Sequence, residues 1–191
     1  MRVAGLLLLG LVGACVRDPD SASCPDLAPG ELVISEIGGK QTGMDTLKPW
    51  IELYNASGKS VDLLGIKVRF RRLNGSDETP TLVRRSLTVA PGAYVVLGLA
   101  DDMNRPAYHD YGISADFHAS WPSQAAVDVE VCGEQLDRVI YNSLPNAGTY
   151  SLGATPPTAE ANDLPANWCT DTTTNTGSFP GTPQKANTAC P

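Results

Sequence analysis

The sequence predicts an all-β protein built as an antiparallel sandwich or barrel. From residue 31 onward, short β-type runs are separated by Gly, Pro and Asn turns, no long stretch keeps helical periodicity, and no βαβ pattern occurs. The 191 residues fit one domain with a sizeable core, and the 18 glycines and 15 prolines suit a chain with many turns. The expected strands are 32–37, 50–54, 66–72, 82–89, 93–97, 127–132, 136–141 and 149–152.

The clearest alternation lies at residues 66–71, where apolar and basic residues take turns. Successive side chains of a strand point to opposite faces, so the apolar residues are expected in the core and the basic ones in water. We expect this strand to pair with strand 82–89 through a turn at Asn74-Gly75. The pairing would gather six cations: Lys67, Arg69, Arg71, Arg72, Arg84 and Arg85.

Two interpretations of this basic hairpin stay open. One is a local anion-binding patch for polysaccharide, lipid head groups or nucleic acid. The other, which we favour, is a solvated sheet face whose charge is balanced by carboxylates such as Asp77 and Glu78. The net charge of −7 excludes a protein that wraps nucleic acid with its whole surface, so nucleic acid is the less favoured partner.

The N-terminus has the pattern of a bacterial lipoprotein signal peptide. A positive end precedes an apolar stretch at 3–12, which is too short to span a bilayer permanently. The run 11–15 resembles a lipobox, in which the cysteine is acylated and becomes the first mature residue. We therefore expect a signal peptide over 1–14, lipidation at Cys15 and a membrane anchor. An ordinary signal peptide cut nearby is the alternative.

The anchored protein is expected in the cell envelope, with the outer membrane favoured because Val16 rather than aspartate follows the lipidated cysteine. Residues 15–30 are poor in hydrophobic side chains and predict a flexible tether. The domain is expected over 31–191, including a tail at 154–191 that is rich in Thr, Pro and Asn. Composition predicts an irregular structure for much of this tail.

Four further cysteines fit an oxidising compartment, because their number is even and no CxxC metal motif occurs. They are Cys24, Cys132, Cys169 and Cys190, which allow three pairings. We favour Cys169 with Cys190, which would tie the tail, and Cys24 with Cys132, which would tie the start of the mature chain to a strand.

The chain contains no Gly-x-Ser-x-Gly elbow, HExxH, Walker loop or EF-hand loop. We therefore expect neither catalytic residues nor a cofactor. The richest polar stretch is the loop 101–118, which carries Asp101, Asp102, His109 and His118. Its ligand types leave a metal-dependent hydrolase as an alternative. Their spacing matches no known metal cage, so we favour a solvated loop and expect no metal.

Several segments resemble the lamin tail domain family, and the bacterial, exported members look most similar. The matching segments are 32–37 (LVISEI), 50–55 (WIELYN), 61–65 (VDLLG), 87–92, 94–97, 136–141, 151–152, 167–168 and 181–183 with Asn187. The resemblance runs from residue 30 to the C-terminus and implies an immunoglobulin-like β-sandwich without catalytic residues. It implies a non-catalytic binding or scaffolding module, lipid-anchored here, with an envelope protein or polysaccharide as partner.

Two polar residues of these segments have structural roles by their position. Asn55 follows a strand, where its side chain can bond its own backbone and shape the turn. Glu52 alternates with Ile51 and Leu53, so it points to the opposite face. If that face is covered, the carboxylate requires hydrogen-bond donors.

Overall fold

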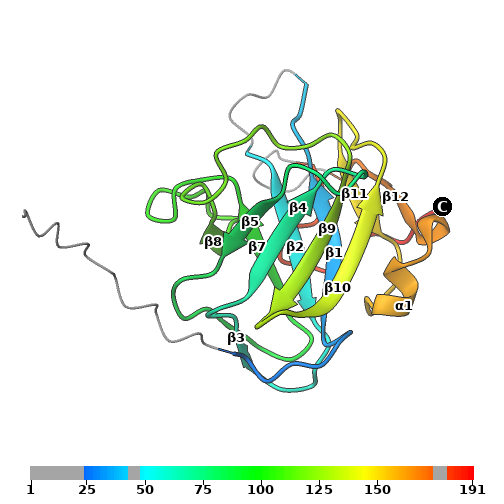
Figure 1. Cartoon of the computed structure of the whole chain (residues 1–191). Coiled ribbons are helices and arrows are strands. Elements are labelled where there is room, and N and C mark those ends of the chain that lie inside the picture. The colour runs from blue at the N-terminus through cyan, green and yellow to red at the C-terminus, as the bar shows by residue number, and fades with distance from the viewer. Residues whose placement is uncertain (1–23, 43–47, 174–179) are drawn as a thin grey trace, which may run out of the picture.

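The computed structural model describes residues 24–42, 48–173 and 180–191, and this part of the chain forms two main β-sheets packed face to face (Figure 1). A small two-stranded sheet, β3 (Val61–Asp62) with β6 (Thr88–Val89), closes one end. The predicted all-β fold, an immunoglobulin-like β-sandwich, is confirmed.

The larger sheet has the strand order β12-β11-β1-β2-β7-β8. Its neighbours are antiparallel except β7 and β8, which form a short parallel pair. The bounds are β1 (Leu32–Gly38), β2 (Trp50–Asn55), β7 (Tyr94–Gly98), β8 (Tyr111–Gly112), β11 (Thr149–Leu152) and β12 (Trp168–Asp171).

The smaller main sheet has the order β10-β9-β4-β5, and all its pairs are antiparallel. Its strands are β4 (Lys67–Arg71), β5 (Thr79–Leu82), β9 (Ala125–Val131) and β10 (Glu134–Tyr141). The alternation predicted at 66–71 is present, because Val68 and Phe70 are buried while the basic residues between them are partly exposed. The core lies between these inner faces and those of the larger sheet.

The prediction of one continuous strand over 82–89 is wrong, because β5 ends at Leu82 and β6 covers only Thr88–Val89. The chain pairs with β4 only up to Leu82 and then leaves that sheet, with Val83 still bonded to the backbone of Ile66. The amide of Leu87 donates to the Asp62 carboxylate at 2.9 Å, beside the small sheet where β6 begins. Side chains from other segments therefore satisfy this backbone in place of a continuous strand.

Residues 24–30, which belong to the expected tether at 15–30, are fixed to the domain rather than flexible. Leu27 is buried in the core, and the amide of Gly30 donates to the carbonyl of Leu136 at 2.8 Å. Cys24 is in a disulfide with Cys132, one of the two pairings that we favoured. The expected signal peptide at 1–14 and the lipidation site Cys15 lie outside the described residues.

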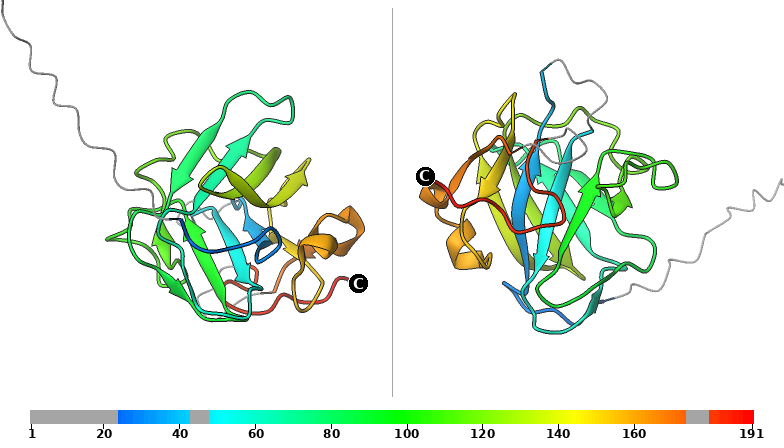
Figure 2. Two further views of the ribbon diagram at one scale, coloured as in Figure 1. Left: turned by 60° about the horizontal axis from the view of Figure 1, so that its bottom comes forward. Right: turned by 180° about the vertical axis from the view of Figure 1, so that it is seen from behind.

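As predicted, the described part of the tail over 154–191 is largely irregular. It contains a short helix, α1 (Ala159–Asn162), a 3-10 turn, η1 (Pro165–Asn167), and the edge strand β12. None of the helices in the described ranges has the length and apolarity needed to cross a bilayer. Cys169 and Cys190 form the second favoured disulfide. Figure 2 (right) shows the red C-terminal segment, residues 180–190, crossing in front of β1 and β2.

Candidate functional site

The outer face of the β4–β5 side carries the predicted basic residues, and its arginines are paired with carboxylates. Arg69 lies 2.6 Å from Glu130 on β9 and 3.2 Å from Glu78 at the start of the returning strand. Asp128 is fully buried and forms ion pairs with both Arg71 and Arg138. The hydrogen bond to Asp128 raises the pKa of Arg138 above its ordinary value.

The other three arginines of the hairpin have their own partners. Arg72 pairs with Asp77 at 2.7 Å in an exposed turn. Arg84 pairs with Asp116, and Arg85 pairs with Asp102 at 2.7 Å. The hairpin thus brings Lys67, Arg69, Arg71 and Arg72 together, whereas Arg84 and Arg85 lie beyond β5 against the polar loop 101–118. These pairs are those expected of a charge-balanced sheet face.

The carboxylates of the polar loop hold backbone in place. Asp102 accepts a hydrogen bond from the amide of Gly112 at 2.8 Å, and Arg85 keeps its pKa below the ordinary value. Asp110 accepts from the amide of Val96 at 2.8 Å. Asp116 accepts from the amide of Leu82 at 2.9 Å. Each of these three carboxylates therefore fixes the loop to a strand, whereas Asp101 accepts hydrogen bonds within the loop, from the amides of Met103 and Asn104.

The two histidines of this loop have different environments. His109 is buried on Gly98, and neither ring nitrogen has a hydrogen-bond partner. Burial lowers its pKa to about 4, with the nearby Arg105 acting in the same direction, so the ring is neutral at physiological pH. His118 is exposed. Across the ranges that the structure describes, no three His, Cys, Asp or Glu side chains are grouped to hold a metal ion.

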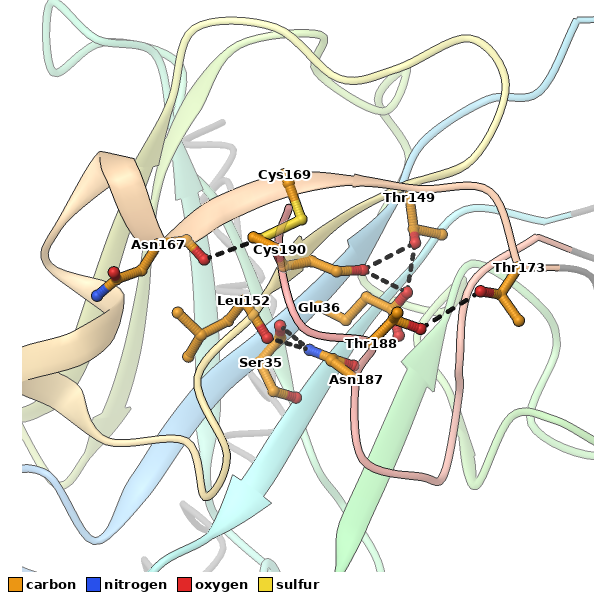
Figure 3. The surroundings of a disulfide bond; sticks show 11 residues. Ser35, Glu36, Thr149, Leu152, Asn167, Cys169, Thr173, Asn187, Thr188 and Cys190 are labelled. Carbon is orange, nitrogen blue, oxygen red and sulfur yellow. Dashed lines mark hydrogen bonds between the residues drawn. A yellow bond between two sulfur atoms is a disulfide. The ribbon is translucent and has the colours of Figure 1, made fainter.

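The ionisable side chain of β1 is Glu36, which is fully buried and whose carboxylate faces the C-terminal segment (Figure 3). It accepts hydrogen bonds from the hydroxyls of Thr149 and Ser151 on β11, the latter at 2.7 Å. The amide of Thr182 donates to it at 3.2 Å. Burial raises the pKa of Glu36 to about 6, although these donors oppose the rise.

Glu52 on β2 is equally buried. It points away from the core residues Ile51 and Leu53, and the face to which it points is covered, so its carboxylate needs hydrogen-bond donors. Ser35 donates its hydroxyl to one carboxylate oxygen at 2.7 Å, and the amide of Gln184 donates to the other at 2.6 Å. Burial raises the pKa of Glu52 well above its ordinary value, and the negative charge of Glu36 raises it further.

The C-terminal segment is held on this face by further bonds. The side-chain amide of Asn187 donates to the carbonyls of Ser35 at 2.7 Å and of Leu152 at 3.1 Å, as Figure 3 shows. Gly181 has φ +88°, and a Cβ there would lie 2.4 Å from a carboxylate oxygen of Glu36. Only glycine lets the backbone approach the carboxylate this closely.

A groove of about 730 Å³ opens at the tip end of the β4–β5 hairpin. Its floor is aromatic: Trp121 stacks on Phe117 with ring centroids 5.2 Å apart and meets the edge of Phe70 at 4.8 Å. Phe70 and Phe117 are buried, whereas Trp121 is partly exposed. The walls come from residues 71–72 and 77–79 of the hairpin and from the segment 119–124.

This groove was not predicted from the sequence. The available signal was Trp121 itself, a large aromatic residue in the polar stretch that precedes β9. The packing of Phe117 and Trp121 on Phe70 could not be predicted from the sequence, because both residues lie 47 or more positions after Phe70 and meet it only in the folded chain.

The fold and these sites define an immunoglobulin-like β-sandwich whose polar clusters bind its own segments together. A family model described as the Lamin Tail Domain matches residues 25–143, which is more than half of the chain. The chain belongs to the lamin tail domain family. This family is generally a non-enzymatic, immunoglobulin-like domain. The comparison with curated proteins finds no match.

The matched range ends just after β10, so the family motifs noted at 151–152, 167–168 and 181–183 lie beyond it. In the structure these segments nevertheless complete the larger sheet, because β11 pairs with β1 and β12 pairs with β11. The described residues beyond the matched range, 144–173 and 180–191, are therefore part of the same folded unit.

Proposed function

We propose that this protein is a non-catalytic, lipid-anchored binding or scaffolding module of the bacterial cell envelope. Its β-sandwich would display a surface to another envelope component, a protein or a polysaccharide. The proposal combines the family membership with the lipobox-like run that ends at Cys15.

The proposal of a non-catalytic role rests on the contacts of the ionisable side chains. Among the described residues, the carboxylates of the loop 101–118 that the sequence suggested as metal or catalytic groups bond to backbone or to arginines. Glu36 and Glu52 are sealed beneath the C-terminal segment, away from solvent. These groups hold segments together, so they support a role in which the outer surface makes the functional contacts.

The proposed anchor would keep the domain near the membrane. Eight residues lie between Cys15 and Cys24, where the described chain begins and is fixed by a disulfide to Cys132. Even fully extended, the nine residue steps from Cys15 to Cys24 reach about 30 Å. The end of the sandwich that holds Cys24 and Cys132 would therefore face the membrane.

To test the anchor, growing cells are labelled with an alkyne fatty acid and their membranes are fractionated. The wild-type chain should carry label and sediment with the outer membrane, whereas Cys15→Ala should lose both the label and the membrane association. Cys169→Ala with Cys190→Ala is the matched control, since it removes cysteines without touching the lipobox. Label that persists in Cys15→Ala contradicts the anchor.

The partner is sought by crosslinking in intact envelopes. A reproducible crosslinked envelope protein or glycan, absent from cells that produce Cys15→Ala, supports the module. A turnover of model ester, phosphoester, peptide or glycoside substrates by the purified protein, lost in the His109→Ala with His118→Ala variant, would contradict the non-catalytic assignment.

A further inference from the structure

We propose that the groove beside the β4–β5 hairpin, with Trp121 in its floor, is a binding site for a neutral carbohydrate chain. The inference deepens the proposed function, because it rests on the chain being an envelope binding module and names the chemistry of its ligand. The groove volume of about 730 Å³ lies within the usual range for small-ligand sites.

The floor supplies a rigid aromatic platform. Trp121 packs against Phe117, whose ring plane is inclined to it by 29°, and against Phe70, whose ring plane is inclined by 60°. Both supporting rings are buried in the core, so they fix the indole and leave part of it at the groove. The negative face of such a ring attracts positively polarised C–H groups, which the apolar face of a sugar ring presents.

The walls supply hydrogen-bonding groups without net charge. Two arginines and two carboxylates line the groove, and they are paired as Arg72 with Asp77 at 2.7 Å and Arg71 with Glu78 at 3.9 Å. A charged ligand gains little attraction from a site that sums to zero. An entirely apolar ligand would bury these groups without partners, which is unfavourable.

A sugar chain satisfies both surfaces at once. Its hydroxyls can donate to the carboxylates and accept from the guanidinium groups, and its C–H face can lie on the indole. The exposed Ser123 and Gln124 at the groove offer further neutral donors and acceptors. The lining therefore fits a neutral glycan better than an acidic polymer or a lipid.

The placement of the groove suits a tethered protein. Gln124 lines the groove and directly precedes β9, while Cys132 directly follows that strand and is bonded to Cys24. Eight residue steps of strand separate them, roughly 25 Å. Figure 1 shows β9 running toward the end where the blue N-terminal residues lie. The groove is thus at the far end of the sheet from the proposed anchor.

The experiment titrates purified protein with neutral hexasaccharides of glucose, galactose, mannose and N-acetylglucosamine, and with a heparin hexasaccharide as the acidic arm. Binding is followed by the NMR signals of the three tryptophan indoles. We expect at least one neutral sugar to shift the Trp121 signal, while the buried Trp50 and Trp168 serve as internal references. The shift should persist at high salt, because the groove carries no net charge.

Variants locate the binding. Arg72→Ala should weaken it at least about tenfold, whereas Arg84→Ala, an exposed and paired arginine outside the groove, should leave it unchanged. Ser120→Trp, at an exposed lining position, should block it without disturbing the core. Thermal unfolding of each variant verifies that the fold is intact.

The proposal is overturned if no neutral sugar moves the Trp121 signal, if only heparin binds, or if binding survives Ser120→Trp in a folded protein. These outcomes are separate from the fate of the proposed function. Loss of fatty-acid labelling in Cys15→Ala and a crosslinked envelope protein would still support an anchored module with a protein partner.

Discussion

Glu36 and Glu52 are direct cross-strand partners on β1 and β2, and both side chains are fully buried under the C-terminal segment. Two carboxylates in one covered site are costly, because neither is solvated and their charges repel. Donors from Ser35, Thr149, Ser151, Thr182 and Gln184 offset part of that cost.

This pair predicts that stability falls as pH rises. Burial raises the folded-state pKa of Glu36 from 4.5 to about 6, and that of Glu52 is also raised, so the folded chain holds these protons more tightly than the unfolded chain. The stabilisation is complete below about pH 4.5 and is lost as pH rises through about 6. Glu36 alone accounts for about 2 kcal/mol of the decrease.

The measurement is urea unfolding between pH 4.5 and 8. Glu36→Gln should remove about 2 kcal/mol of the pH dependence, while Glu134→Gln, at an exposed site, should keep the wild-type curve. Equal slopes for Glu36→Gln and wild type would contradict the role given to this carboxylate.

A second prediction compares two Asn-x-Ser turns. Asn55 is fully buried, and its side-chain amide donates to the carbonyls of Lys59, Val89 and Ala90. In both turns the side-chain oxygen of the asparagine accepts a hydrogen bond from the backbone amide of the serine two residues later. Asn74, however, is exposed. Asn55→Ala should lower the free energy of unfolding by at least ~2 kcal/mol, because buried carbonyls lose their donor. Asn74→Ala should change it by less than ~0.5 kcal/mol. Similar losses in both variants would refute the distinction.

A third prediction concerns arginines with different partners. Arg71 pairs with the fully buried Asp128, whereas Arg72 pairs with Asp77, whose side chain is 64% exposed. Arg71→Gln should destabilise the protein by about 2 kcal/mol, since it leaves a buried carboxylate with one cation fewer. Arg72→Gln should cost less than ~0.5 kcal/mol. Denaturant midpoints that shift equally would show that the burial of Asp128 has no energetic consequence.

A fourth prediction tests the contact between Gly98 and His109. A Cβ on Gly98 would lie 1.9 Å from Nδ1 of His109, so Gly98→Ala should cost ~2 kcal/mol or more through overpacking. His109→Ala removes the ring and should relieve the clash. A double-mutant cycle should therefore give a coupling energy above ~1 kcal/mol. Additive effects would mean that the two residues do not constrain each other.

The paired charges predict little affinity for anionic polymers. Because the five arginines of the hairpin region already face carboxylates, the protein should leave heparin resin at or below about 150 mM salt. The triple variant Arg69→Glu, Arg71→Glu and Arg84→Glu should elute at the same salt concentration as wild type. Strong retention that this variant abolishes would instead support the anion-binding interpretation.

Local patterns were enough to predict the sandwich and part of its detail. The alternation through β4 set which side chains enter the core, and Asn55 was placed correctly as a turn residue. Prediction failed where distant side chains decide the backbone. Residues 84–87 leave the sheet, where Tyr111 accepts from the amide of Arg84 and Asp62 accepts from the amide of Leu87, and neither contact has a local signature.

The same reason explains why the covered face of β1 was not foreseen. Every residue of β1 is buried, so no alternation marks its outer side. Thr182, which caps Glu36 there, lies 146 residues away in sequence. A carboxylate in a hydrophobic strand signalled that donors were needed, as noted for Glu52, but it did not indicate which segment supplies them.

The distance in sequence between Glu36 and Thr182 makes the buried pair depend on the last residues of the chain. In a protein that lacked residues 181–190, β1 and β2 could still pair, but the amides of Thr182 and Gln184 would be absent and both carboxylates would be open to water. The disulfide at Cys190 secures this segment to the edge strand β12. The cover over the two acidic groups is thus supplied by residues that lie far from them in sequence.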